Sequence, residues 1–416
     1  MTTPMSHPRN ALLLKWNRRL VKALTARGVS YAAVVTDYEL ERRRFTLDDL
    51  RDADEIYRIG SHDSASDLFG VAARLLTEDR RYDLVLSPSE FSHYALAVLA
   101  SVVPGTALTA RQVLETRDKR VMKGLFRRAG VRSSEEYTSA GKAADALEAG
   151  IEPVGVVVKP TDGAGARATV IATSAAELAD AVDRLNGRAL LESGLDGDEY
   201  HVDAVWSGRR LTWLSISRYL LPRARVVHST IRNGALLVDP AEEADLYARV
   251  FDDQRRLIDA GDFETGISHG EFFRTGHGLV WTEIASRPGG ACVDHMVGAA
   301  TGRSLTERWV DALLGDDVTM EPLPRDLGRA VGWLNLGPAG SGTVVRCPSL
   351  DEVSAWPGVI DADIRLHTGD RIDITDPSAW SCLVVLEAAD SAEWERRRRV
   401  VEALAHEAYE MQPATP

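Results

Sequence analysis

The chain has 416 residues, of which 44% are hydrophobic and 27% are charged, an ordinary balance for a folded protein of roughly two to four domains. Its 49 Lys and Arg residues against 62 Asp and Glu residues give a formal net charge of −13. This acidity argues against a nucleic-acid-binding protein, because counterion release needs clustered basic side chains. It leaves room for a local basic pocket that binds a small anion.

The three cysteines, Cys292, Cys347 and Cys382, stand far apart in the sequence and form no CxxC or Cys/His pattern. Neither a disulfide scaffold nor a structural zinc site is therefore expected. We find no signal peptide and no segment of transmembrane length. The expectation is a cytoplasmic enzyme that binds no membrane.

The first hundred residues alternate between short apolar runs and segments with helical spacing. Strands are predicted at 11–14, 31–36, 55–59 and 82–87, and helices at 18–27, 64–78 and 91–103. Alternating strands and helices indicate a doubly wound parallel sheet. Such sheets bind ligands at the carboxyl ends of their strands. The candidate site loops are therefore 15–17, 36–38, 60–61 and 87–90.

A different pattern follows Pro104 and Gly105, which interrupt the alternation. One charged helix is predicted over 111–129, and further along there is a helix that begins with a capping box at Ser174. Pairs of strands separated by short turns are predicted at 154–172, 200–214 and 268–284. This mixture predicts an α+β module, followed after Gly315 by a smaller mixed unit that ends in a helix over 391–410.

The loop at 161–167 carries two glycines, Gly163 and Gly165, directly after a strand that contains Lys159. It joins two strands, whereas a Walker A loop or a dinucleotide-binding loop leads from a strand into a helix. Two interpretations remain open. Taken by itself, the loop fits a structural turn better than a flap whose backbone N–H groups close over phosphates.

The hairpin at 268–284 brings two carboxylates together. If 276–278 form a three-residue turn, Phe273 pairs with Trp281 and Glu271 lies opposite Glu283. Their Cβ atoms would then be about 5 Å apart. Two facing carboxylates repel each other unless a cation lies between them. The alternative is an exposed face on which solvent screens the two charges.

Arg287 would share the face of Glu271 and Glu283 if the strand continues that far, because side chains alternate along a strand. Two carboxylates and an arginine on one face suit Mg²⁺ with a bound phosphate group. The hairpin therefore predicts a metal and phosphate site.

Several short motifs are weak signals individually, but their occurrence together in one order along the chain is a specific signal. They are Thr116-Arg117-Asp118-Lys119, Val158-Lys159-Pro160 with the glycine loop, Leu190-Leu191-Glu192, Gly197-Asp198-Glu199-Tyr200-His201-Val202-Asp203, His269-Gly270-Glu271, and Glu283-Ile284-Ala285-Ser286-Arg287-Pro288-Gly289-Gly290. This ordered set resembles the ATP-grasp superfamily, in particular its carboxylate–amine ligases of the L-amino acid ligase type. The resemblance covers nearly the whole chain.

The resemblance implies a fold and a division of the chain. The expected fold is α/β and α+β, in which the N-terminal doubly wound parallel sheet precedes an ATP-grasp fold of two α+β subdomains and a small C-terminal mixed unit. The expected units are 1–108 (N-terminal α/β domain), 109–190 (subdomain with the glycine loop), 191–316 (subdomain with the metal site) and 317–416 (C-terminal α+β unit).

The resemblance also implies a nucleotide site. Its residues would be Lys119, Lys159, Thr161, Gly163, Gly165, Glu192 and Glu199. Lys119 and Lys159 would hold the ATP phosphates and the adenine edge, with the loop at 161–167 as the flap over the β- and γ-phosphates. Glu192 would lie near the adenine amino group and Glu199 at the ribose.

Glu271 and Glu283 resemble the Mg²⁺ ligands of the family, and Arg287 resembles the arginine that clamps the transferred phosphoryl group. His269 stands where the family often has a histidine beside the first metal carboxylate. The sequence departs from the family at Ala285, where many members have an asparagine as a further metal ligand. Two carboxylates with waters or phosphate oxygens would still satisfy octahedral Mg²⁺.

The activity implied is the formation of an amide or peptide bond between a small carboxylate, an amino acid, and an amine, with release of ADP and phosphate. It requires ATP and two Mg²⁺ ions, with Mn²⁺ as an alternative, and small-molecule substrates; a homodimer is left open. Candidate acceptor-pocket residues are Ala291, Val293 and His295, with His228 and Arg274 as polar candidates. Two other hypotheses remain: another ATP-grasp reaction (carboxylation or formate transfer), and a nucleotide-binding module without catalysis.

Overall fold

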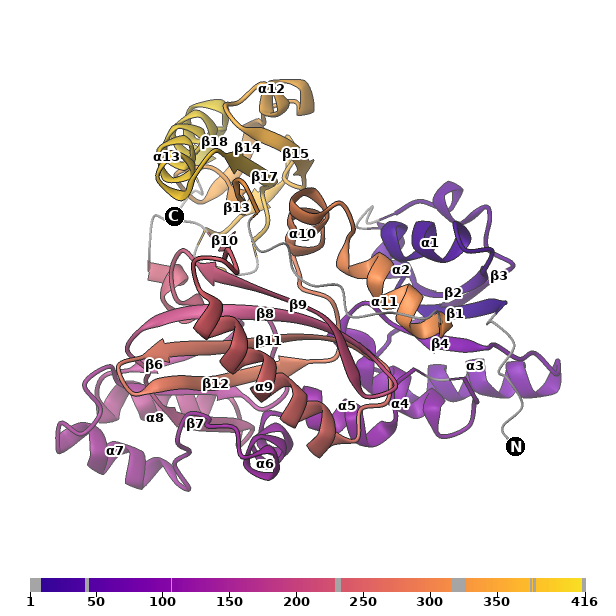
Figure 1. Cartoon of the computed structure of the whole chain (residues 1–416), viewed down its shortest axis with the longest axis horizontal. Coiled ribbons are helices and arrows are strands. Elements are labelled where there is room, and N and C mark those ends of the chain that lie inside the picture. Colours follow the sequence, from indigo (N-terminus) through magenta and orange to yellow (C-terminus); the bar gives the residue numbers. More distant parts are fainter. Residues whose placement is uncertain are drawn as a thin grey trace.

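The computed structural model describes residues 9–41, 45–105, 107–228, 233–315, 327–374, 376 and 379–413. In Figure 1 the N-terminal part (indigo) lies at the right, the C-terminal part (yellow) at the top, and the central part (magenta to orange) at the lower left. The elements that carry the predicted site residues belong to the central part.

The N-terminal sheet is parallel, with the strand order β3-β2-β1-β4, which confirms the predicted fold of this region. Its strands are β1 (Asn10–Leu14), β2 (Ser30–Thr36), β3 (Glu55–Ile59) and β4 (Leu84–Leu86). The helices are α1 (Arg18–Thr25), α2 (Asp37–Glu41), α3 (Ala65–Thr77) and α4 (His93–Ala100). Residues 11–14 are fully buried, as expected of a parallel strand with both faces covered.

The prediction of one helix over 111–129 is wrong. The structure has two helices, α5 (Ala110–Arg117) and α6 (Lys119–Ala129), separated at Asp118. Asp118 has an extended backbone, and its carboxylate caps α6 by accepting hydrogen bonds from the backbone N–H groups of Arg120 and Val121. The break makes Lys119 the first residue of α6, next to the glycine loop.

A small antiparallel sheet of order β6-β5-β7 carries the glycine loop between two of its strands. Its elements are α7 (Ala140–Glu148), β5 (Val156–Pro160), β6 (Val170–Ala172), α8 (Ala175–Arg184) and β7 (Ala189–Ser193). The loop joins β5 to β6, as the sequence predicts.

The large sheet has the order β12-β11-β8-β9-β10-β13-β17-β15 and is antiparallel throughout. Its strands are β8 (Asp198–Ser207), β9 (Arg210–Tyr219), β10 (Gly234–Leu237), β11 (Gly266–Thr275), β12 (Gly278–Ala285), β13 (Ala330–Leu336), β15 (Val359–Ile364) and β17 (Cys382–Ala388). Strands from both sides of position 316 are thus hydrogen-bonded in one sheet. The four-part division stays a prediction.

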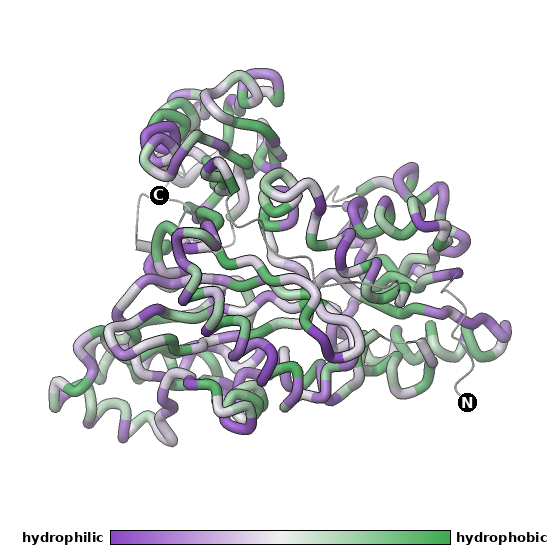
Figure 2. The backbone as a smooth tube through the Cα atoms, viewed as in Figure 1, coloured by the Kyte–Doolittle hydropathy of each residue, from purple (hydrophilic) through white to green (hydrophobic). Residues whose placement is uncertain are grey.

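Further elements complete the described structure. They are η1 (Asp48–Leu50), η2 (Glu90–Ser92), η3 (Arg223–His228), α9 (Ala244–Gly261), α10 (Val293–Thr301), α11 (Leu305–Leu314), β14 (Gly342–Arg346), α12 (Leu350–Ser354), β16 (Arg371–Ile372), α13 (Ser391–Ala408) and β18 (Glu410–Pro413). Among them, β16, β14 and β18 form a separate antiparallel sheet in that order. Helix α9 crosses one face of the large sheet in Figure 1. Hydrophilic and hydrophobic residues are mixed along the helices in Figure 2, which is typical of helices with one buried face.

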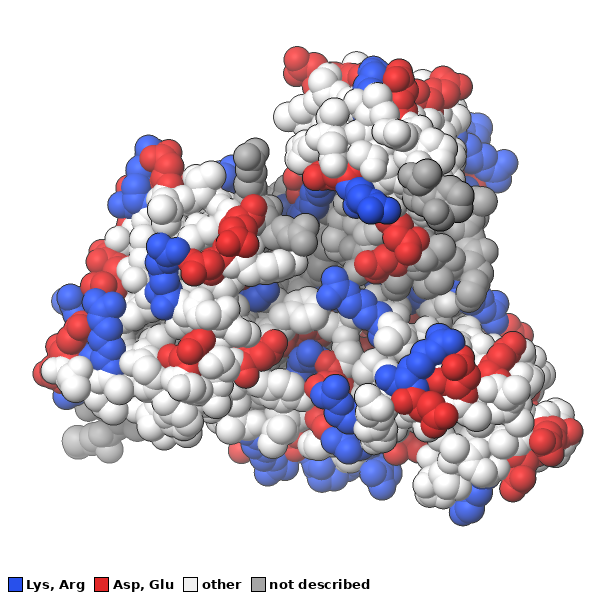
Figure 3. All heavy atoms as spheres, turned by 180° about the vertical axis from the view of Figure 1, so that it is seen from behind, with Lys and Arg blue, Asp and Glu red and all other residues white. Residues whose placement is uncertain are grey.

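None of the helices in the described ranges is long and apolar enough to cross a membrane. On the face that Figure 3 shows, acidic and basic side chains of the described residues are interspersed.

Candidate active site

One cleft, with a volume of about 1830 Å³, gathers the predicted site residues from elements that are far apart in the sequence. It is lined by Lys119, Lys159, Gly163, Gly165, Glu192, Glu199, His269, Glu271, Glu283 and Arg287. Thr161 does not line it. This first residue of the flap is buried, and its carbonyl accepts a hydrogen bond from the backbone N–H of Lys119 at 2.8 Å. The roles assigned to these residues stay predictions.

The side chains of β8 point alternately towards the hydrophobic core and towards the cleft. Tyr200, Val202 and Ala204 pack into the hydrophobic core formed with α6 and α9. Because successive side chains of a strand point to opposite faces, Glu199 and Asp203 point away from that core. The strand pattern thus explains why charged groups lie on the face opposite α9.

Glu271 on β11 lies directly opposite Glu283 on β12, as the sequence predicts. The strand register next to the turn differs from the predicted one. The turn has two residues instead of three, and Phe272, not Phe273, pairs with Trp281. A bulge between Glu271 and Phe272 restores the pairing by adding one residue, Thr282, to β12.

The Thr282 hydroxyl donates a hydrogen bond to the Glu271 carbonyl at 3.1 Å, which fixes the bulge. A strand without the bulge would pair Glu271 with Thr282 and turn the Glu283 side chain to the other face. The bulge is therefore the local feature that puts both carboxylates in the cleft.

Lys119 connects the carboxylate pair to the glycine loop. Its Nζ lies 3.0 Å from Glu283 Oε1 and donates a hydrogen bond to the Gly163 carbonyl at 2.7 Å. The Arg117 guanidinium donates to the same carbonyl at 3.3 Å. These contacts hold the loop against the start of α6, so two cations are already directed at the flap.

Lys159 and Lys123 form a buried ion-pair cluster around Glu192. Burial raises the pKa of the Glu192 carboxyl, but the two lysine charges outweigh burial and lower it. Burial lowers the pKa of Lys159, but the charges of Glu192 and Glu283 outweigh burial and raise it. Lys123 also donates hydrogen bonds to the Ser134 carbonyl and hydroxyl at 2.9 and 2.7 Å. Lys159 is thus a fixed positive charge at the cleft.

Replacing Glu192 by Gln is expected to lower the free energy of unfolding by about 3–5 kcal/mol, because it leaves two buried ammonium groups without their shared carboxylate. Urea unfolding at pH 7 without nucleotide measures the loss. Glu148→Gln, an exposed change on α7, is the matched control. Equal stability of Glu192→Gln and the wild type would contradict a stabilising role for the cluster.

Glu271 is held by Tyr219 and His269. The Tyr219 hydroxyl donates to Glu271 Oε1 at 3.0 Å, and His269 Nε2 lies 3.8 Å from the same oxygen. Asp203 in turn contacts the Nδ1 atoms of His269 and His201, at 2.9 and 2.8 Å. Burial lowers the pKa of His269, but the Asp203 carboxylate outweighs it and raises the pKa to about 9. Asp203 therefore orients His269 and keeps it positively charged beside Glu271.

The trio His201, Asp203 and His269 has ligand atoms within 4.8 Å of one another, close enough for a metal ion. Both oxygens of Asp203 are engaged by the two imidazoles, however. We therefore interpret the trio as a support for Glu271 rather than as a metal centre.

Glu199 is a buried residue that lines the cleft and accepts a hydrogen bond from the backbone N–H of Arg223. Burial and the nearby charge of Glu271 raise the pKa of Glu199 to about 8. A carboxyl group accepts hydrogen bonds when it is ionised and can also donate one when it is protonated.

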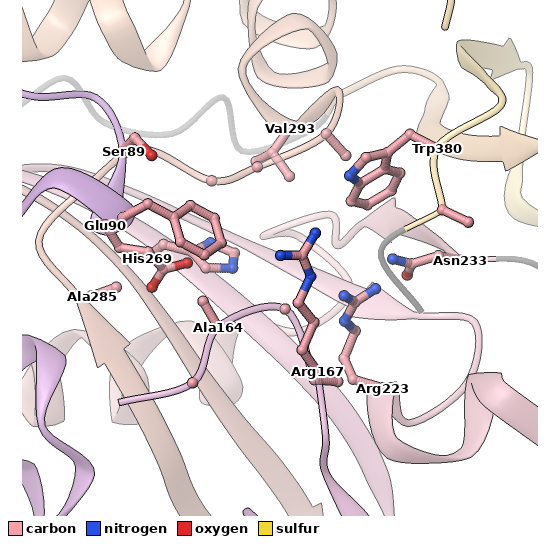
Figure 4. Close-up of a pocket in the computed structure, with 18 of the residues that line it drawn as sticks. Ser89, Glu90, Ala164, Arg167, Arg223, Asn233, His269, Ala285, Val293 and Trp380 are labelled. Carbon is pink, nitrogen blue, oxygen red and sulfur yellow. The ribbon is translucent and has the colours of Figure 1, made fainter. Parts of the chain in front are cut away.

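Arg287 is anchored by a residue of the predicted site loop at 87–90. Its Nη2 donates to Glu90 Oε1 at 2.7 Å, and Glu90 lies in η2, just after β4. Burial raises the pKa of Glu90, but the Arg287 charge outweighs burial and lowers it. Figure 4 shows Glu90 near His269, with Ala164 and Arg167 of the flap below. The sequence feature that points to Glu90 is its position at the carboxyl end of a predicted parallel strand, where such sheets bind ligands.

The other predicted loops differ in their contribution. Residues 15–17 and 88–90 line the cleft, whereas Gly60 and Ser61 do not. The acceptor-pocket candidates Ala291, Val293 and His295 also line it, and His295 is paired with Asp361. Arg274 does not line it and pairs with Glu243 instead. The side chain of His228 lies outside the described part of the structure.

Comparison with solved structures identifies the class of fold: the chain has the ATP-grasp fold. Over 99% of its length it matches an L-amino acid ligase from Bacillus licheniformis, covering 100% of that chain with a TM-score of 0.75 at 15% identity. It also matches a carboxyaminoimidazole ribonucleotide synthase from Aspergillus clavatus complexed with ATP, with a TM-score of 0.71 at 15% identity over 96% of this chain and 99% of that one. The resemblance to the superfamily is thus confirmed at the level of the fold.

Among curated proteins, the chain is similar to an L-arginine-specific L-amino acid ligase of Bacillus subtilis, with 24% identity over 235 residues. The match spans 54% of this chain and about half, 55%, of the relative's length. No family model matches the chain.

Proposed function

We propose that the chain is an ATP-dependent carboxylate–amine ligase that joins an amino acid to an amine through an acyl phosphate. The observation that carries this proposal is the paired carboxylates Glu271 and Glu283, which face the cations Lys119 and Arg287 in one cleft. The similarity to two L-amino acid ligases supports the choice of substrate class.

The side chains present fit a magnesium–nucleotide complex. Glu271 and Glu283 offer the hard oxygen ligands that Mg²⁺ prefers, and phosphate oxygens and waters would complete its coordination. Lys119 and Lys159 would hold the phosphates, with Glu199 at the ribose. Bound Mg²⁺ would supply charge neutralisation at the phosphoryl oxygens. The number of ions is left open, since Ala285 offers no side-chain ligand.

The reaction follows from the charges of the site. A carboxylate is a poor electrophile, so its oxygen first takes the γ-phosphoryl group of ATP, while Lys159 and Arg287 neutralise the spreading negative charge. The amine then attacks the acyl carbon, a proton leaves the nitrogen, and phosphate departs as the amide forms. Closure of the flap at 161–167 would keep water from hydrolysing the acyl phosphate.

Carboxylation is the second candidate, because a biotin carboxylase domain from Hydrogenobacter thermophilus matches with a TM-score of 0.68 at 15% identity, over 98% of this chain and 91% of that one. A nucleotide-binding module without catalysis is disfavoured by the intact set of Glu271, Glu283 and Arg287.

The test is incubation with ATP, Mg²⁺ and pooled amino acids, followed by substrate dropout and quantification of all nucleotides and phosphates. The expected products are ADP and phosphate, formed only when a carboxylate and an amine are both present. AMP and pyrophosphate would contradict an acyl phosphate. ADP formation that depends on bicarbonate would favour carboxylation.

A further inference from the structure

The end of the cleft away from the carboxylate pair holds a buried side-chain amide. Asn233, just before β10, is 3% exposed and lines the cleft. Neither its Oδ1 nor its Nδ2 has a hydrogen-bond partner among the residues that the structure describes. Figure 4 shows its side chain beside Trp380 and Arg223, across the cavity from Glu90 and His269.

The wall beside Asn233 is aromatic and held in place. The Asn335 side chain donates a hydrogen bond to the Ala379 carbonyl and accepts one from the Ser381 backbone N–H, both at 2.9 Å. These bonds fix the backbone on both sides of Trp380. The Trp380 ring lies 6.2 Å from that of Trp333, measured between centroids. Trp380 therefore offers a preorganised surface for a flat or apolar group.

A buried amide needs both a donor and an acceptor from whatever occupies the space in front of it. A carboxylate would satisfy Nδ2 only and would face Oδ1 with a negative charge. An ammonium group would satisfy Oδ1 only. An apolar side chain would leave both atoms unpaired, which is costly in a desolvated site. A carboxamide presents C=O and NH₂ side by side and matches both atoms.

We propose that Asn233 and Trp380 form a substrate subsite that takes the carboxamide side chain of an amino acid. The proposal rests on the ligase function proposed above, since it names the class of one substrate. Arg223, whose guanidinium lies over the Tyr219 ring at 5.7 Å, borders the same space and supplies a positive charge for the carboxylate of that amino acid.

The test is calorimetric titration of L-glutamine, L-methionine and L-glutamate into the protein saturated with Mg·ADP. Methionine has a similar length without the amide, and glutamate replaces the amide by a charge. Glutamine is expected to bind at least about tenfold more tightly than either, the lower part of the range for a buried polar group left unpaired.

Asn233→Leu keeps the approximate size of the side chain and removes both polar atoms. This variant is expected to lose the preference for glutamine over methionine, while its affinity for Mg·ADP stays unchanged and shows that the variant is folded. Asn233→Asp keeps the shape and should weaken glutamine binding as well, because it replaces the donor with a charged acceptor.

Two results would overturn the subsite: no preference of the wild type for glutamine, including no binding of either amino acid, or a preference that persists in Asn233→Leu. Failure of the ligase function would appear separately, as the absence of ADP formation from ATP and amino acids. Glutamine binding without ADP formation would leave the subsite standing and refute the reaction.

Discussion

Replacing Glu283 by Gln is expected to lower the rate of ADP formation by at least about 100-fold, because the neutral amide loses the charge that the metal and the phosphoryl group require. The same change removes the negative partner of Lys119, which lies 3.0 Å away. Initial rates over a range of Mg²⁺ concentrations measure the effect. The loss should persist at saturating ATP, since the missing ligand is needed in the transition state.

Glu264→Gln is the matched control, an exposed carboxylate that precedes β11 and lies outside the cleft. It should leave the rate and the melting temperature unchanged. Glu283→Gln should lose less stability than Arg287→Met, because its side chain is about one-fifth exposed and Lys119 keeps its hydrogen bond to the Gly163 carbonyl. Full activity of Glu283→Gln would remove this residue from the metal site.

Arg287→Met is expected to have two separable effects. Turnover should fall by about 100-fold or more, because the phosphoryl oxygens lose a fixed positive charge. The free energy of unfolding should also fall, by about 3–5 kcal/mol, because Glu90 is left as a buried carboxylate without its partner. Denaturant unfolding and initial rates of ADP release measure the two losses.

The double variant Glu90→Gln with Arg287→Met distinguishes the two roles of Arg287. Removing both charges takes away the uncompensated carboxylate, so most of the stability should return. Activity should not return, since the phosphoryl site still lacks its cation. Recovery of turnover in the double variant would show that Arg287 acts only by holding the fold together.

The sequence was sufficient to predict the N-terminal sheet, because strands buried on both faces appear as short apolar runs such as 11–14. The central hairpin was also predictable from its turn glycines and its alternating pattern. Its exact pairing was not, because a β-bulge has no local sequence signature. Two errors, a turn one residue too long and a missing bulge at Thr282, offset each other and left Glu271 opposite Glu283.

The break at Asp118 was missed because the apolar spacing continues from α5 into α6. An aspartate inside a helical pattern has a competing preference for capping, and here that preference determines the structure. The pairing of Glu90 with Arg287 joins residues 197 positions apart, and that of Lys123 with Glu192 joins two different elements. No local sequence pattern predicts either contact, so both could be identified only from the folded structure.

The transfer of oxygen from the amino acid to the released phosphate tests the proposed reaction most directly. If a carboxylate oxygen attacks the γ-phosphorus, amino acids labelled with ¹⁸O in their carboxyl groups will yield phosphate that carries one ¹⁸O atom for each amide bond formed. Mass spectrometry of the phosphate measures this ratio. Unlabelled phosphate, with the label in AMP or retained in the amino acid, would contradict the acyl-phosphate mechanism.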